Sequence, residues 1–232
     1  VLGAIDASFT DAFFEAMSGL TTTGATAIDR LEDLPDGLKL WRGVLQWLGG
    51  VGIVVVAMVF LPELRVGGMQ IFRSEGFDTS GKILPRAGEI AKQISYIYIS
   101  LTVACMLSYS AMGMNGFDAV VHAMTTVSTG GMANYDNSFA AFGAGVHYVA
   151  VVFMVLAALP FVRFVQILAG TAKPLLYDRQ VHVFLLIIGF CVVFITMWLW
   201  GRSGVMTEVS FRAALFNVTS IMTGTGYASA DY

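Results

Sequence analysis

Three short stretches rich in threonine and glycine have the residue types that bind cations, and they lie at 21–24, 128–131 and 223–226. Threonine and serine contribute hydroxyl oxygens, and glycine permits backbone conformations that aim successive carbonyl oxygens one way. Oxygens arranged in this way can replace the hydration shell of a monovalent cation. We predict a cation site at these three stretches, named turns 1, 2 and 3. The predicted ligand residues are Thr21, Thr22, Thr23, Gly24, Ser128, Thr129, Gly130, Gly131, Thr223, Gly224, Thr225 and Gly226.

The three turns occupy equivalent places in an internal repeat. With one residue skipped after the first phenylalanine, 9–17 and 117–124 share an Asp-Ala-x-x-x-Ala-Met skeleton. The same register places turn 1 on turn 2, and a third copy from Phe216 onward places turn 3 on the same four positions. The sequence therefore contains a repeat of roughly a hundred residues in which each copy ends in a Thr/Gly-rich turn.

The composition predicts that this chain lies in a lipid bilayer. The 232 residues are 56% hydrophobic and only 12% charged, with a mean hydropathy of +0.73. This is more apolar surface than a soluble domain of that size buries, so we expect membrane lipid around an all-α integral membrane protein. The net charge of -3 gives no reason to expect a nucleic-acid partner. Cys105 and Cys191 lie in separate apolar runs and indicate neither a disulfide nor a metal site.

Helical segments of two lengths alternate along the chain. Short segments precede each turn and are too short to span a bilayer, whereas longer apolar segments are long enough. The short helices are expected at 8–20, 117–127 and 210–222. The crossings are expected at 42–63, 94–112, 143–168 and 183–200, with an exposed polar loop over 27–42. The pattern is a helix, a half-length helix with its turn, and a helix, repeated.

The predicted domain organisation follows from these segments. The expected units are 1–61, the first repeat through its outer helix; 62–92, a linker; 93–168, the second repeat; 169–182, a second linker; and 183–232, a third repeat truncated after its turn. The two linkers and their flanks hold eight of the thirteen Lys and Arg residues, so the positive-inside rule places them in the cytoplasm and the turns outside.

A half-length helix that ends within the membrane leaves the non-helical backbone that follows it at that depth. Non-helical backbone is tolerated there only where it is buried in protein or lines a watery cavity. The carboxyl end of each short helix also carries a partial negative charge that favours a cation. Asp11 and Asp118 stand at the opposite, amino ends, where an acid suits the helix dipole, while Ala213 takes this position in the third copy.

Several motifs together resemble a known family. They are the three turns, with 223–227 similar to a potassium-channel signature, and the segments 46–53, 61–62, 66–70 and 85–86. The sequence resembles the Trk/Ktr/HKT potassium transporter family, and specifically membrane subunits of the bacterial TrkH type. The resemblance implies four repeats of helix, pore loop and helix around a pseudo-fourfold potassium pathway in the bacterial inner membrane. It also implies a homodimer on a cytoplasmic nucleotide-binding regulatory subunit (TrkA-like), with K⁺ as the transported ion.

The resemblance carries two further expectations. Only three pore loops are present, without the family's gating loop or fourth repeat, so we expect the chain to be a piece of a longer protein that does not conduct alone. In the family a serine at the fourth position of the first loop goes with sodium, and a glycine goes with potassium. Gly24, Gly131 and Gly226 occupy that position here, which implies potassium over sodium.

Other interpretations stay open at this point. A single Thr/Gly turn is usually a helix C-cap, although three copies in phase favour an ion site. Gly49, Gly50 and Gly52 are typical of close helix packing. The motif at 201–204 matches the Gly-x-Ser-Gly pattern of an intramembrane serine protease, with His147 and His182 as candidate bases. A non-transporting membrane anchor subunit is another alternative, and channel-like uptake is not distinguished from symport with protons or sodium.

Overall fold

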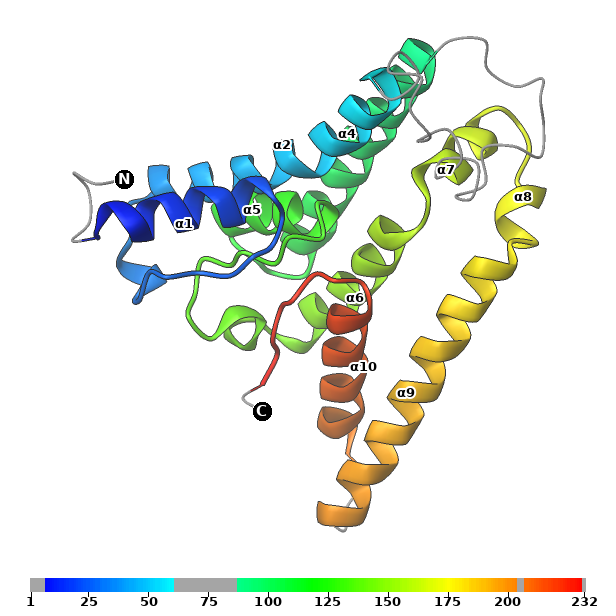
Figure 1. The fold of residues 1–232 in the computed structure, drawn as a ribbon. Helices are drawn as coiled ribbons and strands as arrows, with labels where there is room; N and C mark the ends of the chain where they lie inside the picture. Colours follow the sequence, from blue (N-terminus) through cyan, green and yellow to red (C-terminus); the bar gives the residue numbers. More distant parts are fainter. Residues whose placement is uncertain (1–6, 61–86, 204–206, 231–232) are drawn as a thin grey trace.

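The chain is a bundle of long and short helices (Figure 1). The computed structural model describes residues 7–60, 87–203 and 207–230. Regular structure in these described residues is entirely helical, which confirms the predicted all-α class. The α-helices are α1 (Phe9–Leu20), α2 (Asp36–Phe60), α4 (Ala87–Ala111), α5 (Gly116–Val127), α6 (Ala144–Ala158), α7 (Phe161–Leu168), α8 (Lys173–Leu176), α9 (Arg179–Ser203) and α10 (Glu208–Met222), and 3₁₀ turns lie at η1 (Leu31–Asp33) and η3 (Ser138–Ala141).

The helices α1, α5 and α10, called half-helices below, each end at one of the three turns. They contain 12, 12 and 15 residues. At about 1.5 Å per residue they are about 18 to 23 Å long, short of the ~30 Å hydrocarbon core of a bilayer. Their amino ends are closed by side-chain caps from Ser8, Asn115 and Thr207, each of which accepts the N–H three residues later. Local sequence therefore defines where each half-helix starts.

The start of α10 corrects one detail of the sequence analysis. This helix begins at Glu208, two residues before the predicted start, and so places an acid in its first turn. The third half-helix therefore has an amino-terminal acid, Glu208, five residues before Ala213. Asp11 in α1 plays this part through a capping box, in which hydrogen bonds from Ser8 lower the pKa of its carboxyl group.

Among the residues that the structure describes, two long helices are apolar enough to cross a membrane, over Ala91–Ala111 of α4 and Arg179–Arg202 of α9. The predicted third crossing is not one straight helix. It is divided into α6 and α7, which meet at an 88° bend around Pro160. Proline has no N–H to donate and its ring disfavours helix in the preceding residue, so the chain breaks there.

The predicted exposed loop over 27–42 is also corrected. The helix α2 begins at Asp36 and runs for 25 residues, which is long enough to cross a bilayer. Arg42, expected at the edge of an exposed loop, is a buried side chain inside α2 with 3% of its surface exposed. The linker at 62–92 lies mostly outside the described residues, as do the motifs at 61–62, 66–70 and 85–86, and α4 has already begun at Ala87.

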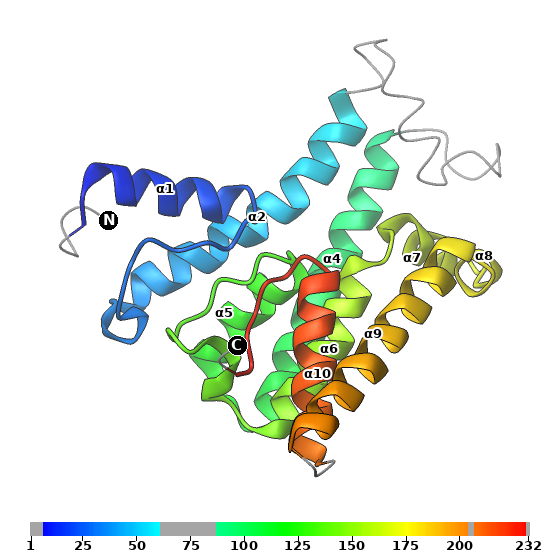
Figure 2. The same cartoon turned by 60° about the horizontal axis from the view of Figure 1, so that its bottom comes forward.

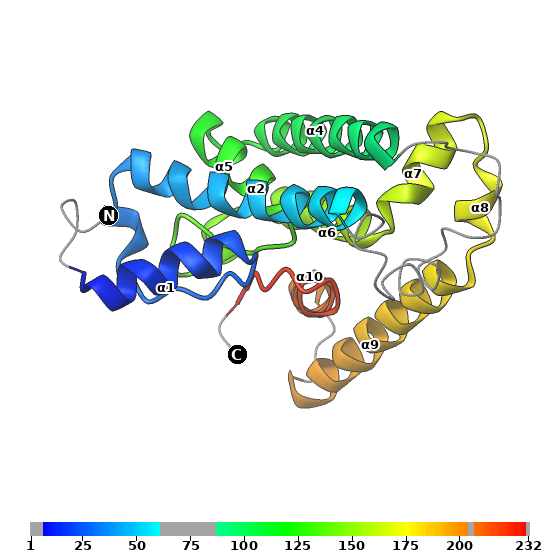
Figure 3. The ribbon, with the colours of Figure 1, turned by 45° about the horizontal axis from the view of Figure 1, so that its top comes forward.

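The helices pack as neighbouring pairs around a core formed by α4, α5 and α6. Figures 1 and 3 show α2 beside α4, and Figure 2 shows α10 lying against α6 and α9. Tyr227, just after turn 3, is buried in this core with its ring centroid 4.2 Å from that of Phe139. The backbone N–H of Phe139 also donates to the carbonyl of Ala228 at 2.9 Å. These contacts join the third turn to the second repeat.

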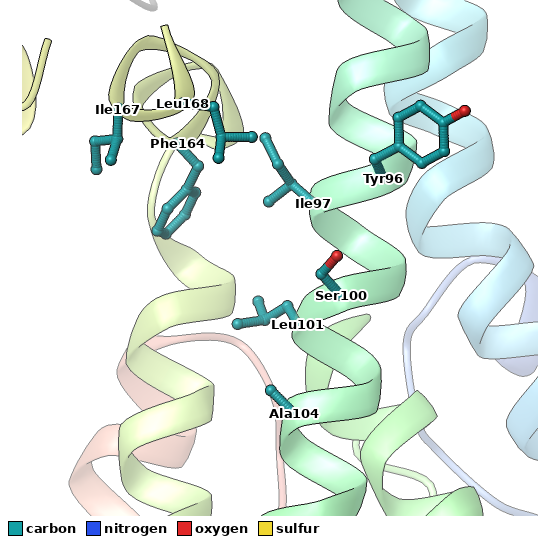
Figure 4. Close-up of a pocket in the computed structure, with 8 residues that line it drawn as sticks. All are labelled: Tyr96, Ile97, Ser100, Leu101, Ala104, Phe164, Ile167 and Leu168. Carbon is teal, nitrogen blue, oxygen red and sulfur yellow. The ribbon is translucent and has the colours of Figure 1, made fainter. Parts of the chain in front are cut away.

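The bend between α6 and α7 leaves an apolar groove against α4. The groove has a volume of about 330 Å³, and Figure 4 shows Ile97 and Leu101 of α4 opposite Phe164 and Leu168 of α7. Arg163 of α7 forms an ion pair of 2.7 Å with Asp178, just before α9. The ion pair fixes the connection between α7 and α9.

Candidate functional site

The three turns leave their half-helices through the same hydrogen bonds. We number the residues of each turn as positions 1 to 4. The position-1 N–H donates to the carbonyl four residues earlier, at 2.8, 3.1 and 2.9 Å in turns 1, 2 and 3. The position-3 N–H donates to the carbonyl five residues earlier, at 2.9 Å in every turn. The register found in the sequence is therefore also the register of the backbone.

The backbone dihedral angles repeat in the same register. Position 2 has a positive φ in all three turns, with 56° at Thr22, 50° at Thr129 and 74° at Gly224. Position 4 also has a positive φ throughout, with 80°, 75° and 86° at the three glycines Gly24, Gly131 and Gly226. Each turn therefore alternates between negative φ at positions 1 and 3 and positive φ at positions 2 and 4.

A helix C-cap explains only part of this geometry. The bond from position 3 to the carbonyl five residues earlier is a Schellman motif, which requires a left-handed residue at position 2. That position normally takes glycine, yet Thr22 and Thr129 are β-branched and rarely adopt positive φ. A C-cap also does not require the second positive φ at position 4. Strain held in this way is characteristic of functional sites.

Adjacent turns touch each other through position 4 of one and position 3 of the next. A Cβ atom on Gly24 would overlap the carbonyl oxygen of Gly130, and one on Gly131 would overlap the carbonyl oxygen of Thr225. The same contact thus joins turn 1 to turn 2 and turn 2 to turn 3. Gly226, at position 4 of turn 3, has open space beside it. The three turns therefore lie next to one another in chain order, each in contact with the next.

Gln46 of α2 holds turn 2 from behind, and its side chain is fully buried. Its amide nitrogen donates to the Gly130 carbonyl at 2.7 Å, and its amide oxygen accepts from the Met132 N–H at 3.1 Å. A carbonyl oxygen has two lone pairs, so the bond from Gln46 leaves Gly130 able to accept once more. In the sequence, Gln46 is recognisable only as the first residue of the 46–53 motif.

Replacing Gln46 with leucine is expected to destabilise the protein by about 2 kcal/mol or more, because two buried backbone groups lose their partners. Thermal unfolding in detergent measures this loss. Leu48→Ala, at an exposed position on the same helix, is the control and should have a small effect. Equal stability of the Gln46→Leu variant and the parent would show that Gln46 does not support turn 2.

Hydroxyl groups of the turns keep oxygen lone pairs free for a ligand. Thr21 donates to the Met17 carbonyl, and Thr223 donates to the Thr219 carbonyl, at 2.8 Å in both cases. In both turns the hydroxyls of positions 1 and 3 lie 2.8 Å apart. Because a hydroxyl that donates its proton still accepts at oxygen, these groups remain suited to a cation. A cavity of about 250 Å³ lies between turns 1 and 2, lined by Thr21, Thr22, Ser128 and Thr129 among others.

Close helix packing explains two of the glycines in α2. A Cβ atom on Gly49 would overlap the carbonyl oxygen of Leu20, and one on Gly50 would meet the Tyr98 hydroxyl and Ser128. Gly52 has open space around it. The packing interpretation therefore applies to Gly49 and Gly50 and lets α2 approach both turn 1 and turn 2.

A buried ion pair between α1 and α2 lies near the first turn and is not among the residues predicted from the sequence. Arg42 Nε lies 2.7 Å from Glu15 Oε1, with 3% and 4% of the side chains exposed. Arg42 also donates to the Ala133 carbonyl at 3.0 Å, beyond turn 2. The available signal was a pair of opposite charges in segments flanked by apolar residues. The pair joins the first half-helix, α2 and the second repeat.

The protease motif is not assembled into a catalytic site among the described residues. His147 donates from Nε2 to the Phe139 carbonyl at 2.7 Å and accepts from Arg212 at Nδ1, so both ring nitrogens are engaged. His182 and Gly201 lie near opposite ends of α9, about 28 Å apart along the helix axis. Residue 204 of the motif lies outside the described residues.

Comparison with known proteins identifies the family. The family model described as TrkH, cation transport protein, matches residues 4–232. The chain belongs to the TrkH family. This TrkH-family chain is 46% identical to the Trk system potassium uptake protein TrkI of Halomonas elongata. The match covers 100% of this chain and 47% of that protein. It is 36% identical to TrkH of Escherichia coli K12, over 96% of the chain and 47% of that protein.

A solved structure supports the same assignment. The crystal structure of the potassium transporter TrkH from Vibrio parahaemolyticus matches with a TM-score of 0.82 and 35% sequence identity. The match covers 97% of this TrkH-family chain and 46% of that chain. The chain therefore spans about half the length of the relatives it matches. The family consists of transport proteins, which favours the transport interpretation over the intramembrane protease.

Proposed function

We propose that this chain supplies three pore loops of a potassium-uptake protein and that the three turns are its selectivity filter. The observation that carries the proposal is the alternation of positive φ at positions 2 and 4 in three turns that touch in succession. Such a backbone presents several carbonyl and hydroxyl oxygens within a small volume. These oxygens substitute for the hydration shell of K⁺ as the ion passes, and the carboxyl ends of the half-helices favour positive charge.

The proposed discrimination between potassium and sodium depends on glycine at position 4. Gly24 and Gly131 each lie against a carbonyl of the next turn, so a side chain at either position would displace an oxygen. A filter whose carbonyls are held in place by neighbouring backbone keeps the spacing suited to the larger ion. The open space beside Gly226 is the place where a fourth loop would complete the ring.

The proposed organisation in the cell follows the predicted units and their charge. The repeats 1–61, 93–168 and 183–232 lie in the bacterial inner membrane as a multi-pass protein, and the linkers 62–92 and 169–182 face the cytoplasm. We propose that the complete transporter is a homodimer. Its cytoplasmic face binds a nucleotide-binding regulatory subunit of the TrkA type.

Crosslinking tests this regulatory contact. A crosslinker attached at Lys173, in α8 of the second linker, is expected to capture a soluble nucleotide-binding partner in cells that express the whole system. Lys39 of α2, on the predicted outer side, is the control and should capture none. Capture from neither position, or equal capture from both, would contradict the proposed topology and partner.

Rubidium uptake tests the transport function itself. The complete transporter, expressed in bacteria that lack their own potassium-uptake systems, is expected to restore growth at low potassium and to take up Rb⁺. Excess K⁺ should compete with this uptake, and equal Na⁺ should not. A non-transporting membrane anchor predicts no uptake even at normal abundance in the membrane, and this result would overturn the proposal. Repeating the assay with and without a proton gradient separates a channel from a symporter.

A further inference from the structure

The half-helices carry a second feature that repeats in register, outside the turns. Six residues before position 1, each half-helix has a side chain with a hydrogen-bond acceptor: Glu15, His122 and Asn217. Six residues after position 1 in each repeat, a backbone N–H donates to that acceptor. The distances are 3.1 Å from Ala27 to Glu15, 3.4 Å from Asn134 to His122 and 3.0 Å from Ser229 to Asn217.

These three side chains share the ability to accept a hydrogen bond, although they belong to three different residue types. A carboxylate, an imidazole and an amide all accept a hydrogen bond, although their charge and shape differ. In His122 the nitrogen that accepts is Nε2, so the proton resides on Nδ1, which lies 2.9 Å from the carbonyl oxygen of Asp118. What the repeats preserve is therefore the acceptor and its position.

The bond closes a small loop around each turn. Its two ends are the half-helix and the segment that leaves the turn, with the four turn residues between them. The glycine at position 4 lies next to that departing segment. Fixing the departing segment to the half-helix therefore fixes the direction in which the chain leaves position 4.

The first repeat strengthens this connection with charge. Glu15 also accepts from the Thr26 hydroxyl at 3.1 Å, and it is paired with Arg42. Arg42 reaches the Ala133 carbonyl in the departing segment of turn 2. The connection in repeat 1 is thus coupled to the one in repeat 2, whose departing segment includes Asn134.

We propose that Glu15, His122 and Asn217 are positioning residues for ion selectivity. Each ties the segment that leaves its turn to its own half-helix and so sets the position-4 backbone that faces the next turn. None of them touches the transported ion. The proposal rests on the proposed function of the turns as a selectivity filter and adds the group that holds each turn in shape.

The test removes the acceptor and the donor separately in the third repeat, where the acceptor is the uncharged side-chain amide of Asn217. Asn217→Leu deletes the acceptor, and Ser229→Pro deletes the donor because proline has no N–H. Asn217→Asp keeps an acceptor oxygen and is the matched control. The ratio of Rb⁺ to Na⁺ uptake by the complete transporter is measured for each variant at equal abundance in the membrane.

Asn217→Leu and Ser229→Pro are each expected to lower that ratio roughly fivefold, the scale of one buried hydrogen bond. The double variant should be little worse than either single one, because both changes remove the same bond. Asn217→Asp should keep the parent ratio of Rb⁺ to Na⁺ uptake. If the parent discriminates between the ions and the folded Asn217→Leu or Ser229→Pro variant keeps the parent ratio, the positioning role is overturned. The proposed filter would be unaffected by that result. A parent without discrimination would overturn both.

Discussion

The Gly24→Ser variant of the complete transporter is expected to lose most of its preference for potassium, with the ratio of Rb⁺ to Na⁺ uptake falling about tenfold or more, equivalent to at least about 1.4 kcal/mol. Gly24 has a φ of 80°, which side-chain-bearing residues rarely adopt, and its missing Cβ would overlap the Gly130 carbonyl oxygen. The serine must therefore displace an oxygen of the next turn. Uptake ratios in cells that lack other potassium systems measure the effect.

Gly116→Ser provides the control for this substitution. Gly116 is the first residue of the half-helix α5, has no positive φ, and a Cβ atom added there would enter open space. The same chemical change there should leave the uptake ratio at the parent value. A Gly24→Ser protein of normal abundance with an unchanged ratio would show that turn 1 is not part of the filter.

Breaking the buried ion pair is expected to have the largest effect on stability. Arg42→Met leaves the Glu15 carboxylate buried without its charged partner, which should cost about 3–5 kcal/mol of unfolding free energy. The Glu15 side chain is 4% exposed, so water does not compensate its charge. Thermal unfolding of the purified transporter in detergent, followed as the fraction that remains folded, measures the loss.

A double variant separates stability from selectivity at this position. Glu15→Leu combined with Arg42→Met removes both charges and should recover most of the stability lost by Arg42→Met alone. The same double variant lacks the acceptor for the Ala27 N–H, so its Rb⁺ to Na⁺ ratio should fall below the parent value although it folds. Recovery of both properties would contradict a positioning role for Glu15.

The half-helices and their turns could be predicted because their signals are local. Caps at Ser8 and Asn115, the short apolar segments and the repeated Thr/Gly turns all lie within a few residues of one another. The bend of the third crossing depends on Pro160, which could have indicated a break, although hydropathy alone is continuous across it. The early start of α2 at Asp36 was missed because its first turns are polar and resemble a loop.

The supports behind the turns could not be predicted because they join distant segments. Arg42 meets Glu15 from 27 residues away, and Gln46 meets Gly130 from 84 residues away. Their polar character within apolar segments is visible in the sequence, but nothing in the local pattern shows which distant residue each one meets. The equivalent acceptors in the three half-helices also differ in residue type, so an alignment by identity does not reveal them. Their shared position becomes visible only with the backbone bonds.

Locating the transported ion tests the central claim most directly. Crystals of the complete transporter grown with Tl⁺ or Rb⁺ in place of K⁺ would reveal the ion by its anomalous scattering. The filter proposal predicts an anomalous peak within the ring of turns, in contact with oxygens of residues 21–24, 128–131 and 223–226, and its replacement by K⁺ but not by Na⁺. An ordered ion elsewhere along the pathway, with no peak among the three turns, would contradict the account.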